Sequence, residues 1–288
     1  MTLLFRLDAN QEFGFGHLVR CISLVGELRN RKPAENLRIV FAGNFSEPAC
    51  EMLQQNKIEF VNSCIENEYA FIENQISLLQ PSLLYIDKIY GYSKVFVEQI
   101  QKQLPVVMMH NLCEATPYCT CFILPSAHTP HEKLSEFGLT RAKPNWFIGA
   151  EYIVLNRQVV NAVPITKKGY ALQLIVTTGG SDPEKVLLSL LHMLIAYPDN
   201  SLQIKALYGP SIGFFDELQA LQPNLPANIS IGRFAVEHLL QADMAICTFG
   251  ISTYELMYLG IPVISVAHAQ SNALGSKTLA ENHRSIID

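Results

Sequence analysis

The stretch from Phe5 to Leu24 reads FRLDANQEFGFGHLVRCISL and decides the fold of the first part of the chain. An apolar strand ends in charged residues, a loop with two glycines follows, and an amphipathic helix is expected to begin near His17. Gly14 and Gly16 permit a tight turn and the close approach of a ligand to the backbone. The first N–H groups of such a helix are free to bind that ligand. The G-x-G-x-x-G pattern is absent, so a dinucleotide-binding loop is not predicted.

The same alternation of strand and helix continues outward along the chain, which predicts βαβ units and parallel sheets. The fold class is therefore α/β, with two Rossmann-like lobes whose parallel sheets face each other across a cleft. The pattern is interrupted between about Thr129 and Gly169, so we predict an N-terminal lobe over 1–150, a linker over 151–169 and a C-terminal lobe over 170–288. The expected strands are TLLFRL, LRIVFA, KIEFVN, SLLYID, LPVVMM, LQLIVTT, LQIKALY, DMAIC and IPVISV.

Composition excludes several classes of function. The 288 residues carry a net charge of −5 and contain no run of five or more like charges, so no nucleic-acid or membrane-surface partner is expected. The opening MTLLFRLD lacks a basic region before its apolar residues, and the longest apolar window, LLSLLHMLIAY, is too short to span a bilayer. Seven scattered cysteines suit a reducing compartment. We therefore expect a cytoplasmic protein without membrane insertion.

One cluster of cysteines and histidines could be imagined as a zinc site, but its spacing argues against a metal. No C-x-x-C pair is present, and free cysteine packs as a small apolar residue. Packing in the core is the favoured interpretation, and no metal is predicted. The cluster comprises His110, Cys113, Cys119, Cys121, His128 and His131.

His17 is the candidate base. At a helix N-terminus the dipole disfavours the imidazolium form, which leaves a neutral ring able to accept a proton. Arg6 and Asp8 lie at the end of an apolar strand, where charges are costly unless they are paired or used, and we expect them at the same strand end as His17. A structural ion pair of Arg6 with Asp8 or Asp87 is the alternative for these charges, and an ordinary surface residue is the alternative for His17.

The second motif is TTGGSDP, again between a strand and a helix. Asp182 is expected to cap that helix, with Pro183 as its first residue. The pair Gly179 and Gly180 leaves room for a ligand to contact the backbone, although a simple tight turn explains the glycines equally well.

The third motif is FGISTYELMYLGIPVI, in which a helix should begin near Ser252 after Gly250. Ser252 and Glu255 fit an S-x-x-E capping box, which would account for both residues. The alternative is a diphosphate site formed by the free N–H groups and the hydroxyls of Ser252 and Thr253. Glu255 could then accept hydrogen bonds from a ribose diol.

Taken together, FRLDANQEFGFGHLVRC, the YID segment, IGAEYIVLN, TTGGSDP and the third motif resemble one family over essentially the whole chain. It is the family of UDP-sugar hydrolases of pseudaminic acid biosynthesis and the related spore-coat polysaccharide proteins, which are similar to GT-B glycosyltransferases. The resemblance implies a catalytic N-terminal lobe and a UDP-binding C-terminal lobe. His17 would activate water for inverting attack on the anomeric carbon of a UDP-linked N-acetylated deoxyhexose, with Asp8 orienting the base or the substrate, and with no metal or cofactor.

The resemblance also implies how the substrate is bound. The diphosphate would lie near Ile251, Ser252 and Thr253, the ribose at Glu255, uracil beside the backbone at Phe234, and the sugar between His17 and the Gly179-Gly180 loop. The full set of expected substrate-binding residues is Arg6, Gly14, Gly16, Asp87, Tyr152, Gly179, Gly180, Ser181, Phe234, Gly250, Ile251, Ser252, Thr253, Glu255 and Gln270.

The chain departs from the family at three places. His110-Asn111 replaces an Asp-Asp pair, Ala269-Gln270 replaces Asn-Gln, and Tyr152 is followed by Asn156 where the family has arginine. Two alternatives to a hydrolase therefore stay open: a glycosyltransferase with a UDP-sugar donor, and a non-catalytic protein that binds a nucleotide sugar.

Overall fold

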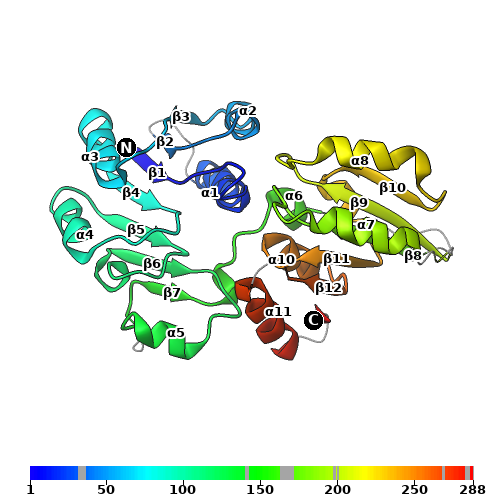
Figure 1. The fold of residues 1–288 in the computed structure, drawn as a ribbon. Coiled ribbons are helices and arrows are strands. Elements are labelled where there is room, and N and C mark those ends of the chain that lie inside the picture. The colour runs from blue at the N-terminus through cyan, green and yellow to red at the C-terminus, as the bar shows by residue number, and fades with distance from the viewer. Residues whose placement is uncertain are drawn as a thin grey trace. The chain divides into compact units, whose positions relative to one another are not determined.

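The computed structural model describes residues 1–31, 37–139, 143–162, 172–196, 199, 201–267, 270–282 and 286–287 (Figure 1). The chain forms two compact units. The first comprises Met1–Asn10 and His17–Val154, and the second comprises Gln11–Gly16 and Leu155–Asp288. Residues 163–169 of the predicted linker lie outside the described residues.

The first unit contains a seven-stranded sheet in the order β3-β2-β1-β4-β5-β6-β7, and every pair of neighbours is parallel. The chain winds outward from β1 in one direction and from β4 in the other, so the strand order reverses between these two strands. In open parallel sheets, ligands bind beyond the carboxyl ends of the strands at such a reversal. The strands are β1 (Thr2–Arg6), β2 (Arg38–Gly43), β3 (Glu59–Asn62), β4 (Leu83–Ile86), β5 (Val106–Met109), β6 (Cys121–Leu124) and β7 (Trp146–Ile148).

Helices cover both faces of this sheet (Figure 1). On one face, α3 and α4 pack onto buried strand residues such as Leu4, Leu84 and Val106. On the other face the rings of Phe5, Phe41 and Tyr85 stack together, and α1 lies over this side of the sheet. The helices are α1 (Gly16–Arg31), α2 (Glu47–Gln55), α3 (Glu68–Leu79), α4 (Lys94–Gln101) and α5 (His131–Glu136), with 3-10 turns at Thr116–Tyr118 and Ala150–Tyr152.

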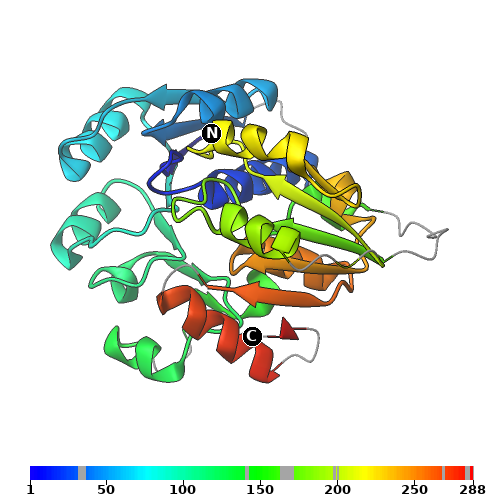
Figure 2. The ribbon, with the colours of Figure 1, turned by 45° about the vertical axis from the view of Figure 1, so that its right-hand side comes forward.

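The second unit repeats the same winding in a six-stranded sheet of order β10-β9-β8-β11-β12-β13. Its strand order reverses between β8 and β11. Figure 2 shows α7 and the strands of this sheet from a second direction. The strands are β8 (Leu172–Thr177), β9 (Leu202–Tyr208), β10 (Ile229–Arg233), β11 (Met244–Thr248), β12 (Val263–Val266) and β13 (Ile286–Ile287). The helices are α6 (Arg157–Val160), α7 (Val186–Ala196), α8 (Phe215–Leu221), α9 (Val236–Leu239), α10 (Ile251–Tyr258) and α11 (Gln270–Asn282), with a 3-10 turn at Gln222–Asn224.

The predicted α/β class with two Rossmann-like parallel sheets is confirmed. Each apolar run named from the sequence contains a strand, whereas β6, β7, β10 and β13 were not predicted. β7 and β10 lie at the edges of their sheets, where burial is lower, and β10 contains Ser230, Gly232 and Arg233. Edge strands of this kind lack the continuous apolar pattern of strands buried on both faces.

The predicted start of α7 is wrong. The helix begins at Val186, and Pro183 lies in the preceding turn. Asp182 has a φ of +46° and its carboxylate accepts hydrogen bonds from the backbone N–H groups of Val186 and Leu187, each at 2.9 Å. The carboxylate therefore caps the helix from four residues upstream, because the left-handed backbone turns its side chain toward the free N–H groups.

No helix in the described part of the chain has both the length and the apolar character needed to cross a membrane.

Candidate active site

His17 lies in the first turn of α1, and its partner is Asp87, directly after β4. Nδ1 of His17 lies 2.7 Å from Oδ1 of Asp87, whose side chain is fully buried. Arg20, one turn further along α1, donates to both oxygens of the same carboxylate, with 2.8 Å between its Nε and Oδ2. Cys21 Sγ lies 3.3 Å from Oδ2. The carboxylate is thus surrounded by donors from α1.

These contacts bear on the tautomer of the His17 ring. Burial alone would raise the pKa of Asp87, but the charges of Arg20 and His17 and their hydrogen bonds lower it well below its ordinary value. Asp87 is therefore ionised and can only accept, so its 2.7 Å contact is a hydrogen bond when the proton is on Nδ1 of His17; the same Nδ1 also lies 3.0 Å from Nη2 of Arg20. A neutral ring with Nδ1 protonated carries its lone pair on Nε2, which is the atom left to act as a base. The side chain of His17 is 16% exposed, so solvent can reach it.

Asp8 was expected to orient either His17 or the substrate. The first role is not observed, because Asp87 contacts His17 instead, and strand alternation explains why; the second role stays a prediction. Arg6 is aligned with Ile86 in the β1–β4 register, and successive side chains of a strand point to opposite faces of the sheet. Arg6 and Asp8 therefore share the face covered by α3, whereas Asp87 points to the face covered by α1. The structure brings Asp87 to the histidine and leaves Asp8 on the other side.

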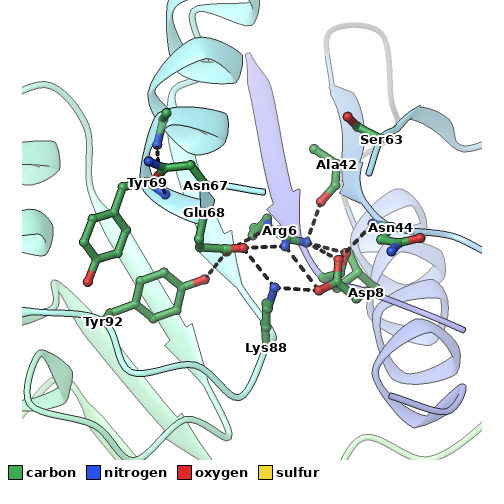
Figure 3. A network of polar contacts seen from close by, with 12 residues as sticks. Arg6, Asp8, Ala42, Asn44, Ser63, Asn67, Glu68, Tyr69, Lys88 and Tyr92 are labelled. Atoms are coloured by element: carbon green, nitrogen blue, oxygen red, sulfur yellow. Dashed lines mark hydrogen bonds and ion pairs between the residues drawn. The ribbon is translucent and has the colours of Figure 1, made fainter. Parts of the chain in front are cut away.

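Arg6 and Asp8 belong to a buried ion network on the α3 face (Figure 3). Arg6 donates to Asp8 at 2.5 Å and to Glu68 of α3 at 2.6 Å. Lys88 contacts the same two carboxylates at 2.7 and 2.9 Å, and Tyr92 donates its hydroxyl proton to Glu68 at 2.6 Å. Two cations face two carboxylates, so the charges balance. The structural ion pair of Arg6 and Asp8, the alternative left open by the sequence, is the observed arrangement.

Removing one charge from this network should destabilise the fold in a pH-dependent way. Glu68→Gln leaves two buried cations facing one carboxylate, which should lower the free energy of unfolding by about 3–5 kcal/mol at pH 7. Burial opposes ionisation of Asp8 and Glu68, but Arg6 and Lys88 outweigh it and lower both pKa values below 3.8 and 4.5. Because the pKa values of these two carboxyl groups are lower in the folded than in the unfolded protein, their ionisation stabilises the fold. This contribution is fully present above about pH 4.5 and is lost as the pH falls further.

Chemical denaturation between pH 7 and pH 3 measures both effects. The Glu68→Gln variant should lose less stability than the wild type on acidification, because one of the titrating carboxylates is gone. Glu59→Gln is the matched control, since Glu59 is half exposed and pairs with Arg38 at the surface. Surface pairs contribute about 0–1 kcal/mol, so equal losses in the two variants would show that the buried network has no special role.

His110 follows β5 and lies near His17, with 6.3 Å between the ring centroids. Burial, together with the charges of Arg20 and His17, lowers the pKa of His110 to about 3. The ring is therefore neutral at physiological pH. Of the other members of the sequence cluster, Cys113 and Cys119 are buried in the apolar core as predicted, whereas Cys121 and His128 are half-buried and His131 is exposed. The described residues contain no group of three or more metal-binding side chains arranged to hold an ion.

In the second unit, the Gly179-Gly180 loop follows β8 and requires glycine. Gly179 has a φ of +84°, a conformation that residues with a side chain rarely adopt. Gly209, after β9, packs directly against this loop: a Cβ atom at Gly209 would lie 2.1 Å from the carbonyl oxygen of Gly179. Ser211 also donates its backbone N–H to the oxygen of Gly180 at 3.0 Å. The loop is held in place by backbone contacts, and an added Cβ at Gly179 would meet no atom within 4 Å.

The helix α10 begins at Ile251, beyond β11, with Gly250 as its N-cap. Thr253 supplies the capping side chain: its hydroxyl accepts from the N–H of Gly250 at 3.2 Å and contacts Cys247. The capping-box alternative for Ser252 and Glu255 is therefore wrong, because the N-cap is Gly250, two residues before Ser252. In the described part of the chain the N–H groups of Ile251 and Ser252 make no hydrogen bond. These two groups and the Ser252 hydroxyl fit an anion, whereas the fully buried Thr253 hydroxyl is occupied.

The other expected binding residues are placed as follows. Glu255 is buried; burial raises its pKa although the backbone N–H of Asn156 donates to it at 3.1 Å. Phe234 follows β10 and donates its backbone N–H to the carbonyl oxygen of Tyr208 at 2.9 Å. Tyr152 belongs to the first unit and packs edge-on against Phe147. Gln270 is the first residue of α11, and its side chain lies outside the described residues, as does Ala269. Gly14, Gly16 and Ser181 lie at or beside the two strand–helix loops in which they were predicted.

Sequence reasoning missed one member of the site, Arg20, and one member of the buried ion network, Glu68. Arg20 sits one turn after His17, at i+3, which places both side chains on one face of α1. Its spacing was visible in the sequence, but an arginine in a helix is ordinarily exposed. Glu68 gave no signal, since it reaches Arg6 from a helix 62 residues away.

Two Rossmann-like units with parallel sheets define a GT-B-like fold, and solved structures of that kind are similar to this chain. MurG of Acinetobacter baumannii superposes with a TM-score of 0.61 at 12% identity, covering 97% of this chain and 83% of the other. The calicheamicin glycosyltransferase CalG4 gives 0.60 at 15%, covering 97% and 83%. The S. aureus MnaA-UDP co-structure gives 0.58 at 10%, covering 96% and 83%.

In sequence, the chain is 23% identical over 274 residues to the uncharacterized protein MJ1062 of Methanocaldococcus jannaschii. The match covers 92% of this chain and 55% of that protein, so the chain spans about half the length of the relative. No family model matches the sequence.

Proposed function

We propose that this protein cleaves a UDP-sugar at the anomeric carbon, with His17 as general base and water as the nucleophile. The observation that carries the proposal is the contact of Nδ1 of His17 with the ionised, buried Asp87, which leaves Nε2 as the proton acceptor. The pair lies at the point of the first sheet where bound ligands are expected. A carboxylate that fixes the tautomer of a histidine and stabilises its protonated form is a recurring device for general base catalysis.

The proposed reaction has one displacement step. Nε2 of His17 takes a proton from water, the water oxygen bonds to C1 of the sugar, and the bond from C1 to the diphosphate oxygen breaks with its electrons going to UDP. Attack opposite the leaving group inverts the anomeric centre. The free N–H groups of Ile251 and Ser252 in the second unit are proposed to bind the diphosphate, where they would stabilise the charge that develops on UDP.

The substrate class is also part of the proposal. The S. aureus MnaA-UDP co-structure supports a uridine nucleotide, because UDP is named in it and its fold is similar. The resemblance of the sequence motifs supports a UDP-linked N-acetylated deoxyhexose used in making a pseudaminic-acid-like cell-surface sugar.

A glycosyltransferase is the second candidate, and it is favoured by the similarity to the glycosyltransferase CalG4. The same base would then deprotonate an acceptor hydroxyl in place of water. In that case the sugar would appear as a glycoside and free sugar would form only slowly.

A substrate screen tests the proposal. The full-length protein is incubated with UDP-N-acetylglucosamine, UDP-N-acetylgalactosamine and their 6-deoxy derivatives, and released UDP and sugar are quantified. A hydrolase should release equimolar UDP and free sugar without an acceptor. UDP at 100 times its dissociation constant should also stabilise the fold by about 2.7 kcal/mol. No turnover together with stabilisation by UDP would indicate a non-catalytic binding protein, and no response of the melting temperature to UDP would contradict every nucleotide-sugar function.

A further inference from the structure

His110 is a chemically unusual residue beside the proposed base. It follows β5, and its backbone N–H donates to the carbonyl of Ile123 at 2.9 Å. Its φ is +54°, in the left-handed region that residues with a side chain avoid. Such conformations cost on the order of 1–3 kcal/mol and concentrate where function requires a particular side-chain direction. The backbone therefore turns this imidazole in a strained but defined direction.

The imidazole of His110 also has an unsatisfied nitrogen. Nδ1 is buried and has no hydrogen-bond partner among the described residues. The ring is neutral, because burial and the neighbouring Arg20, His17 and His128 lower its pKa to about 3 against the opposing effect of Asp87. A neutral imidazole has one N–H donor and one acceptor. Since burying an N–H without a partner is costly, the proton belongs on Nε2, and the ring presents an N–H donor there.

The distance between the two rings suits one shared oxygen. The centroids of His17 and His110 are 6.3 Å apart, and the ring planes meet at 51°. Two hydrogen bonds of about 2.8 Å to a common oxygen separate their nitrogens by about 4.5–5 Å. A centroid separation of 6.3 Å is compatible with such a pair of nitrogens, one an acceptor and the other a donor.

We propose that His110 is a further catalytic residue, which donates a hydrogen bond from Nε2 to the oxygen that His17 deprotonates. The inference rests on the proposed function. Water then gives one proton to Nε2 of His17, accepts a hydrogen bond from His110 on one lone pair, and attacks C1 with the other. His110 keeps its proton throughout. An ionised carboxylate at this position could accept a hydrogen bond from the water but could not donate one to it.

A pair of substitutions at this position tests the role. His110→Phe keeps a ring of similar size and removes the donor, so kcat should fall by about 10²-fold with KM little changed, as expected when a nucleophile is no longer held in line. His110→Gln keeps an N–H close to the position of Nε2 and should recover kcat to within about tenfold of the wild type. Thermal unfolding of both variants shows whether the fold is intact. Equal kcat values for the Phe and Gln variants would overturn the role, because a residue needed only for packing would not distinguish them.

A second measurement needs no turnover. The ¹⁵N NMR spectrum of the histidine rings in the ligand-free protein at pH 5 should show His110 neutral with its proton on Nε2. A protonated ring, or a proton on Nδ1, would overturn the inference. If the wild type cleaves UDP-sugars and His110→Phe retains the full kcat, only the proposed role of His110 is overturned. If the wild type cleaves none of the substrates, the proposed function and the proposed role of His110 are both overturned, whatever the NMR spectrum shows.

Discussion

His17→Ala should slow the release of UDP from an accepted UDP-sugar by about 10²-fold or more. The reason is that Nε2 of His17 is the proton acceptor, and a positioned general base contributes about 10²–10⁴-fold to the rate. KM should change little, because the proposed binding groups for the nucleotide are on the second unit. The measurement is the initial rate of UDP release at saturating substrate.

A matched control is available on α7. His192 is an exposed histidine, so His192→Ala makes the same chemical change away from the site and should leave the rate unchanged. Added imidazole should restore part of the activity of His17→Ala, since it can enter the space left by the side chain. A His17→Ala variant with the wild-type rate would show that another group takes the proton.

Asp87→Asn should lower kcat by about 10²–10⁴-fold, the upper figure being the cost of the same change in the Ser-His-Asp triad of a serine protease. The amide can donate to Nδ1 of His17, which favours the tautomer with its proton on Nε2 and removes the acceptor. Arg20 also loses its ionic partner, so the free energy of unfolding should fall by about 3–5 kcal/mol. Steady-state kinetics at a temperature where the variant stays folded separates the two effects.

Asp8→Asn is the control for this change. Asp8 is also a buried carboxylate that follows a central strand and pairs with an arginine, but it faces α3 instead of α1. It should lose stability to a similar extent and retain kcat within a few-fold of the wild type. If Asp8→Asn lost as much kcat as Asp87→Asn, the assignment of Asp87 as the carboxylate that orients His17 would be wrong.

Much of the fold follows from the sequence because its central strands are buried on both faces. Runs such as LLF in β1 and LIV in β8 are continuous and apolar, which distinguishes them from loops without knowledge of their partners. The glycine loops and the start of α1 near His17 follow from local backbone rules. The edge strands β7 and β10 carry no comparable pattern, so local reasoning does not detect them.

The site was only partly predictable for a different reason. To predict which of the carboxylates Asp8 and Asp87 contacts His17, one needs the register of β1 against β4. That register pairs residues about 80 positions apart. Given that register, the alternation of side chains assigns each carboxylate to its face. The helix caps were also predicted incorrectly. Asp182 caps α7, but its left-handed backbone places it four residues before the helix begins. The N-cap of α10 is Gly250, two residues before Ser252, and Thr253 supplies the capping side chain.

The most direct test of the account is cleavage of an accepted UDP-sugar in H₂¹⁸O, with the released UDP analysed by mass spectrometry. Activation of water by His17 for attack on the anomeric carbon predicts unlabelled UDP, because the bond between C1 and oxygen breaks and UDP keeps its own oxygen. The same unlabelled product should form far more slowly with His17→Ala. UDP that contains ¹⁸O would place the attack on phosphorus and contradict the account.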